Sequence, residues 1–217
     1  MEIKGGHDNK FNVLMYEYMG TAALLTAINM GSAMSGGVLT PIAIGFTVLS
    51  GIAYLGPVCG AHFNVAVTVA VYVREGPENF LKNFSLCIQI IIAELLGAIT
   101  GCLFTYLMNQ KDEVSKELYP GITLLCPNRA PWDSADMLCD GSGYLLQVLF
   151  VEAFVTFVFI STIMSLKYDS VTDKHMEGAY TVCLCLIGMI ATSAFYTGGC
   201  LNPAVGSIQT IFQYFMI

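Results

Sequence analysis

Two stretches, GAHFNVAVT at residues 60–68 and GGCLNPAVG at residues 198–206, decide how this chain is expected to fold. Each stretch has a Gly-containing turn, then an Asn, then a short apolar run. Asn is a preferred residue at a helix N-cap, and Pro203 stands at a first helical position, where no backbone N–H is needed. We therefore expect one helix to begin at Asn64 and another at Asn202.

The two expected helices are too short to cross a membrane. They cover residues 64–73 and 202–217, whereas a spanning helix needs about 20 mostly apolar residues. Irregular backbone at membrane depth is tolerated only where protein buries it or where it lines a water-filled cavity. Two half-helices behind Gly-containing turns therefore predict two re-entrant loops around a central pore.

The remainder of the chain is strongly apolar. Of its 217 residues, 55% belong to the set AVILMFWYC and only 12% are charged, against about 25% charged residues in soluble proteins. We expect an integral, multi-pass membrane protein in contact with the lipid bilayer, and leave open whether that membrane is the plasma membrane, an internal membrane or a mitochondrial one. Five segments are long enough to span it: residues 11–30, 38–58, 84–108, 144–166 and 178–195.

The charged residues give an orientation and exclude one class of partner. A net charge of −7 argues against binding to nucleic acid. Basic residues are enriched on the cytoplasmic side of membrane proteins. Six of the nine Lys and Arg residues fall on the side of the N-terminus: Lys4, Lys10, Arg74, Lys82, Lys167 and Lys174.

A Glu-containing span precedes each half-helix at nearly the same distance, which predicts an internal repeat. Glu17 lies 64 − 17 = 47 residues before Asn64, and Glu152 lies 202 − 152 = 50 residues before Asn202. Three spans in each half would invert the second copy, so that the half-helices meet near the midplane. We expect one domain, 1–217, made of a first repeat over about 11–108, a loop over 109–143 and an incomplete second repeat over about 144–217.

These motifs resemble the aquaporin, or major intrinsic protein, family along nearly the whole chain. That resemblance implies an all-α polytopic fold with six tilted helices and two re-entrant half-helices that carry Asn-Pro-Ala boxes. The residues AELLGA at 93–98 resemble the family's third-span motif. Adding the repeat distance, 202 − 64 = 138, to Glu94 places its counterpart near position 232, beyond Ile217. The sixth transmembrane helix is therefore expected to be missing from this sequence.

The resemblance also implies a function and a set of pore residues. We expect a passive channel for water or small uncharged solutes, in which the side-chain amides of Asn64 and Asn202 contact the solute and two helix N-termini oppose cations. Glu17 and Glu152 would brace the loops, and His62 would help to pack the first loop. Family members usually form homotetramers. The two boxes are Asn64-Val65-Ala66 and Asn202-Pro203-Ala204.

The sequence departs from the family at the filter of the pore. Val205 stands where the family usually has an arginine, and the other filter positions fall on Ile44, on Ile190 or Met189, and on Gly199. An apolar filter without a cation should exclude protons and cations less strongly and admit larger neutral solutes. In the first box, Val65 replaces a proline whose fixed φ favours the start of a helix.

The cysteines and histidines suggest a reactive thiol and a disulfide but no metal site. Cys200 lies two residues before Asn202 and is a candidate for blocking by thiol reagents. Cys126 and Cys139 share the long loop, and the sequence leaves open whether they form a disulfide there, which would need an oxidising face. A di-metal site would need Glu-x-x-His pairs, which the histidines do not form, so we expect no metal, no cofactor and no enzyme activity.

One alternative function is left open by the sequence. The altered first box, the absent filter arginine and the missing sixth helix also suit a degenerate, non-conducting subunit of a larger membrane complex.

Overall fold

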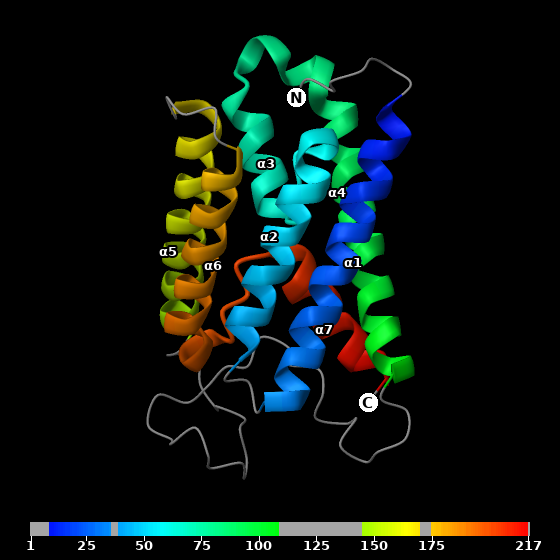
Figure 1. Ribbon diagram of the computed structural model, residues 1–217, viewed down its shortest axis with the longest axis vertical. Coiled ribbons are helices and arrows are strands. Elements are labelled where there is room, and N and C mark those ends of the chain that lie inside the picture. The colour runs from blue at the N-terminus through cyan, green and yellow to red at the C-terminus, as the bar shows by residue number, and fades with distance from the viewer. Residues whose placement is uncertain (1–8, 36–38, 109–144, 170–174, 217) are drawn as a thin grey trace.

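Helices account for almost all of the structure, a computed structural model that describes residues 9–35, 39–108, 145–169 and 175–216. A π-helical turn, η4, follows α5 at Ser165–Asp169. The helices, shown in Figure 1, are α1 (Lys10–Ser35), α2 (Thr40–Cys59), α3 (Val65–Arg74), α4 (Pro77–Met108), α5 (Leu145–Met164), α6 (His175–Thr197) and α7 (Pro203–Met216).

The predicted all-α fold is confirmed, and each expected span corresponds to one long helix. The largest difference in bounds is at α4, which begins at Pro77, seven residues before the expected start at position 84. Pro at the first helical turn has the φ angle that a helix needs, and Glu78 places a negative charge near the positive end of the helix dipole. Both features start the helix before its apolar part.

Within the residues that the structure describes, four helical segments are long and apolar enough to cross a membrane: α2, α4, α5 with η4, and α6. Helix α1 is not among them, although its 26 residues extend about 39 Å. Its polar residues Glu17, Thr21 and Asn29 are fully buried. These buried polar side chains lower the mean hydropathy of α1, and they face other helices rather than the outer surface.

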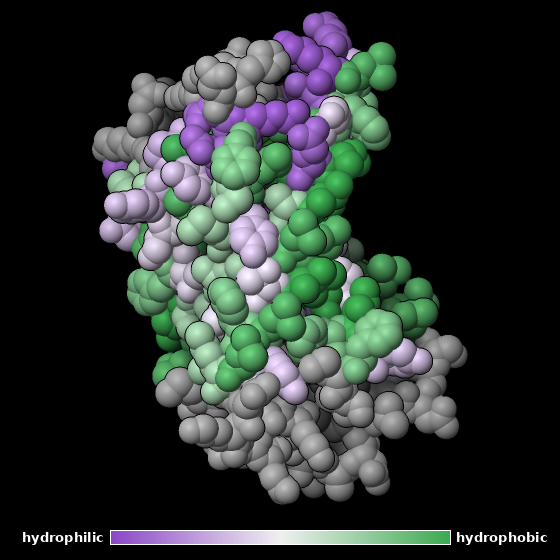
Figure 2. All heavy atoms as spheres, turned by 90° about the vertical axis from the view of Figure 1, so that its right-hand side faces the viewer, coloured by the Kyte–Doolittle hydropathy of each residue, from purple (hydrophilic) through white to green (hydrophobic). Residues whose placement is uncertain are grey.

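The outer surface of the helices is apolar. Figure 2 shows hydrophobic residues over the middle of the face formed by α1 and α4, with hydrophilic residues gathered at one end. This distribution fits a belt in contact with lipid and one end in contact with water. On α4 the exposed apolar side chains recur at helical spacing: Ile88, Ile92, Leu96, Ile99, Leu103 and Leu107.

Two glycines let α1 and α4 approach closely. A Cβ atom on Gly97 would lie 2.3 Å from the carbonyl oxygen of Tyr18, and one on Gly101 would lie 2.5 Å from Cβ of Leu25. The two glycines are four residues apart and so lie on one face of α4, the small-xxx-small arrangement that favours close helix packing in membranes. This contact fixes α1, which carries Glu17, beside α4, which carries Glu94.

The two half-helices lie end to end inside the bundle. In Figure 1, α3 extends from the middle of the molecule towards the end where the N-terminus lies, and α7 extends towards the opposite end. Their first residues follow Asn64 and Asn202, as the sequence predicts. Both positive helix ends therefore point at the centre of the molecule.

Replacing Gly97 by Ala should destabilise the protein, because the new methyl group would overlap backbone that cannot move independently. We expect a loss of about 1 to 3 kcal/mol, measured as a lower midpoint of thermal unfolding in detergent. Gly188→Ala is the matched control, since nothing lies within 4 Å of the corresponding Cβ position in α6. Equal midpoints for the two variants would contradict the close α1–α4 contact.

Candidate functional site

The loops before the two half-helices have the same unusual backbone. In each loop the residues four, three and one positions before the Asn have positive φ angles, a region that is strained for residues other than Gly. The first loop has φ values of 90° at Gly60, 49° at Ala61 and 48° at Phe63, and the second has 88° at Gly198, 65° at Gly199 and 49° at Leu201.

Two buried carboxylates hold the first loop. Glu17 accepts hydrogen bonds from the backbone N–H groups of His62, at 3.1 Å, and Phe63, at 2.8 Å. Glu94 accepts one from the backbone N–H of Asn64 at 3.2 Å. Three successive N–H groups that the membrane interior cannot hydrate are thus bound by side chains from α1 and α4.

Glu152 of α5 holds the second loop in the same way. Its two carboxylate oxygens accept from the backbone N–H groups of Cys200 and Leu201, each at 3.1 Å. The hydroxyl of Thr197 also donates to Glu152. Glu17 and Glu152 therefore bind the residues two and one positions before Asn64 and Asn202, respectively.

Each Asn caps its own half-helix. The side-chain oxygen of Asn64 accepts from the backbone N–H of Ala66 at 2.8 Å, and that of Asn202 accepts from Ala204 at 3.0 Å. Val65 begins its helix as Pro203 does, because the Asn cap satisfies the first turn in both cases. The caps fix the orientation of both amide groups.

The nitrogen of each amide then bonds to the opposite loop. Asn64 Nδ2 donates to the carbonyl oxygen of Leu201 at 3.0 Å, and Asn202 Nδ2 donates to the carbonyl oxygen of Phe63 at 2.8 Å. Residues almost 140 positions apart in the chain are thereby joined reciprocally. Each amide has two N–H groups, so these bonds use one N–H of each Asn.

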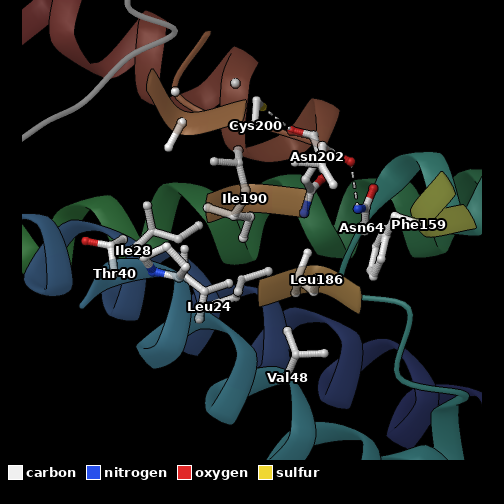
Figure 3. Close-up of a pocket in the computed structure, with 18 of the residues that line it drawn as sticks. Leu24, Ile28, Thr40, Val48, Asn64, Phe159, Leu186, Ile190, Cys200 and Asn202 are labelled. Carbon is white, nitrogen blue, oxygen red and sulfur yellow. Dashed lines mark hydrogen bonds between the residues drawn. The ribbon is translucent and has the colours of Figure 1, made fainter. Parts of the chain in front are cut away.

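A cavity of about 220 Å³ extends from the two Asn residues towards the start of α2. Figure 3 shows Asn64 and Asn202 at one end of it and Thr40 at the other. All four filter positions expected from the sequence line the cavity: Ile44, Ile190, Gly199 and Val205. Between the two residues left open for α6, it is Ile190 that lies at the wall, and Met189 is not part of the lining.

Two further residues that were singled out from the sequence also line this cavity. His62 is buried, and its Nδ1 lies 3.0 Å from the hydroxyl of Thr68. Cys200 is partly exposed and unpaired, with its Sγ 3.0 Å from the carbonyl oxygen of Asn202. Cys126 and Cys139 lie outside the described residues.

The first loop depends on an aromatic ring that the sequence analysis did not single out. A Cβ atom on Gly20 would lie 2.0 Å from the ring of Phe63, and one on Gly51 would lie 2.5 Å from it. The ring therefore occupies a slot that two glycines leave between α1 and α2. A signal was present in the sequence, because Phe63 is the one large apolar side chain among residues 60–64, which form this turn.

A buried polar group on α7 was also missed. Gln209 Nε2 donates to Asn29 Oδ1 at 2.5 Å, and Asn29 Nδ2 donates to Thr105 at 3.5 Å. These bonds tie α7 to α1 and α4 in the half of the bundle opposite to Glu17. Polar residues inside apolar segments are the signal that marks them.

Among the described residues, no group of three or more His, Cys, Asp and Glu side chains is arranged to hold a metal ion. The buried carboxylates instead accept backbone hydrogen bonds.

A family model for the major intrinsic protein matches residues 10–213 of the chain. The chain belongs to the major intrinsic protein family. Its sequence is 29% identical to Aquaporin AqpM of Methanothermobacter thermautotrophicus, over 88% of this chain and 70% of that protein. It is 30% identical to Glycerol uptake facilitator protein-like 6 of Lactiplantibacillus plantarum, over 88% of this chain and 75% of that protein.

The fold of this family member also matches a solved structure. The X-ray structure of the aquaglyceroporin from Plasmodium falciparum superimposes with a TM-score of 0.72 over 95% of this chain and 82% of that chain, at 17% sequence identity. The protein is thus an integral, multi-pass membrane protein and a passive channel for water or small solutes. The alternative of a non-conducting structural subunit is not favoured. Proteins of this family are channels rather than enzymes.

Glu17→Gln should destabilise the folded channel, because the new amide presents an NH2 group to a backbone N–H that needs an acceptor. One buried N–H left without a partner costs about 1 to 3 kcal/mol, and Glu152→Gln should have a similar effect on the second loop. The measurement is the midpoint of thermal unfolding in detergent. Glu78→Gln, the same change on an exposed residue, is the control. Equal unfolding midpoints for Glu17→Gln and Glu78→Gln would contradict the bracing role of Glu17.

Proposed function

We propose that the chain conducts water and small uncharged solutes such as glycerol along the cavity, past Asn64 and Asn202. The observation that carries this proposal is the reciprocal bonding of the two Asn side chains at the inner end of that cavity. It holds two amide groups in fixed orientation at the midplane. One domain made of a first repeat and an incomplete, inverted second repeat, as expected from the sequence, forms the path.

The second N–H of each Asn is the group we assign to the solute. A water molecule at this point would accept hydrogen bonds from both amides and would have to turn its own hydrogens away from them. That orientation interrupts a continuous chain of donated hydrogen bonds between waters. The N-termini of α3 and α7 add two partial positive charges at the same depth, which opposes the passage of cations.

The composition of the filter determines which solutes pass. Ile44, Ile190 and Val205 are each about 5% exposed, and their side chains offer no hydrogen bond. An apolar wall suits the carbon chain of a small polyol better than a wall with an arginine does. The names of the similar proteins, which include a glycerol uptake facilitator and an aquaglyceroporin, support this substrate class.

Assembly as a homotetramer, with one pore in each subunit, is part of the same proposal and rests on the family resemblance. Chemical cross-linking of the purified chain in detergent checks it. Cross-linked products at the mass of four copies are expected. Only the band of a single copy would contradict the tetramer.

Val205→Arg should narrow the range of solutes. The arginine would place a charge and several donors in the filter, so glycerol permeability should fall at least tenfold relative to water permeability. Both rates are measured by stopped-flow light scattering on proteoliposomes. Val205→Met is the matched control for side-chain length without charge. An unchanged ratio of the two permeabilities in Val205→Arg would show that Val205 is not at the constriction.

Cys200 should make the channel sensitive to mercurial reagents, because this residue is partly exposed and lines the cavity. Treatment should reduce water permeability severalfold in the wild type and have little effect on Cys200→Ser. Inhibition of both proteins to the same extent would place the reactive thiol elsewhere.

A further inference from the structure

Lys167 is the one cationic side chain that the structure places in contact with the lining of the cavity among the described residues. It lies in η4, at the end of the molecule to which α3 extends, and its Nζ is 3.4 Å from Nε2 of His62. His62 in turn lines the cavity beside Asn64. In the sequence alone, Lys167 is only one of the six basic residues that orient the chain.

The hydrogen-bond directions around His62 are determined by its neighbours. The hydroxyl of Thr68 donates to Glu94 at 2.6 Å, so its oxygen accepts from Nδ1–H of His62. Nε2 of the neutral ring therefore carries a lone pair, and it accepts from the ammonium group of Lys167. Lys167 is thus the first donor in a series of hydrogen bonds that passes through His62 and Thr68 and ends on Glu94.

Two features hold Lys167 in this place. A π-helical turn interrupts the helix at Ser165–Asp169, and such turns are rare and frequent at functional sites. The next residue, Tyr168, packs under Arg74 of α3, with the guanidinium carbon 5.3 Å from the ring centroid. Lys167 as a whole residue is exposed, and its Nζ nevertheless reaches the ring of the buried His62.

The position of this charge matters because of what surrounds it. Glu17 and Glu94 are fully buried in the same half of the bundle, and Lys167 interacts electrostatically with Glu17. An ionised carboxylate at this depth attracts a cation, and a fixed positive charge near it opposes that attraction. At the opposite half, the filter position that the family gives to an arginine is the neutral Val205.

We propose that Lys167 is a specificity-determining residue that excludes protons and cations. It would act in the inner half of the pore, between the two Asn residues and the end to which α3 extends, and so supply the fixed charge that the filter lacks. This inference rests on the proposed function, because it needs a conducting pore. A unit charge within several ångströms of the path, at the effective dielectric constant of about 20 that applies near a protein surface, changes the rate for a monovalent cation by about tenfold or more.

The test compares Lys167→Gln, Lys167→Met and Lys167→Arg with the wild type in proteoliposomes. Proton flux is followed with an entrapped pH-sensitive dye under a clamped membrane potential, and water permeability is measured on the same vesicles. Lys167→Gln keeps a donor for His62 but removes the charge. We expect it and Lys167→Met to raise proton flux per unit of water permeability about tenfold, while Lys167→Arg stays at the wild-type value. Lys82→Met, on an exposed residue of α4, controls for loss of a surface charge.

The outcomes separate this inference from the proposed function. If Lys167→Gln has the same proton flux as the wild type and its water permeability is intact, the role of the charge is overturned. This holds even if Lys167→Met leaks protons because its bond to His62 is lost. A leak of equal size in Lys82→Met would also overturn it. A wild type without water permeability above that of empty vesicles would overturn the proposed function and this inference together.

Discussion

The backbone of two loops at the centre of the bundle has no water to bond to, and the rest of the structure follows from how its N–H and C=O groups are satisfied. Each loop uses a carboxylate from a neighbouring span, Glu17 or Glu152, and the amide of the Asn that ends the other loop. Because the Asn bonds are reciprocal, neither loop has its full set of partners alone. The two halves of the chain must therefore fold against each other before either re-entrant loop is stable, which explains why the half-helices lie end to end.

The same constraint explains why two different sequences adopt one backbone. Gly60 and Gly198 have φ angles of 90° and 88°, but at the next position the first loop has Ala61 where the second has Gly199. A non-Gly residue at positive φ costs about 1 to 3 kcal/mol, and the first loop accepts this cost. It is offset by the carboxylate bonds and by the ring of Phe63, which the glycines of α1 and α2 enclose. The geometry is therefore imposed by the partners of the loop more than by its own residues.

Much of this arrangement follows from local pattern, and the remainder depends on contacts that pattern does not encode. The Asn N-caps, the Glu at matching distances and the apolar spans are local or periodic signals, so the half-helices and all five long helices were predicted, with α4 beginning earlier. Which of Ile190 and Met189 faces the cavity depends on the rotation of α6, which an apolar segment leaves undetermined. The bonds of Gln209 to Asn29 and of Lys167 to His62 join residues 180 and 105 positions apart. No repeat or motif pairs such residues, and only the assembled bundle does.

The distribution of polarity along the pore affects ions and protons differently. A hydrated cation at the apolar filter would lose part of its hydration shell without any replacement, which costs several kcal/mol, so the neutral side chains of Ile44 and Val205 already slow it. A proton is different, because it moves by exchange along a chain of waters and need not be dehydrated. Its exclusion depends on the orientation of water at Asn64 and Asn202 and on fixed positive charge near the path. The half-helix N-termini supply part of that charge, and Lys167 adds a full unit on the side where the buried carboxyl groups would otherwise favour a proton. Its contact with His62, which hydrogen bonds through Thr68 connect to Glu94, places this charge in the half of the bundle that holds the buried carboxyl groups.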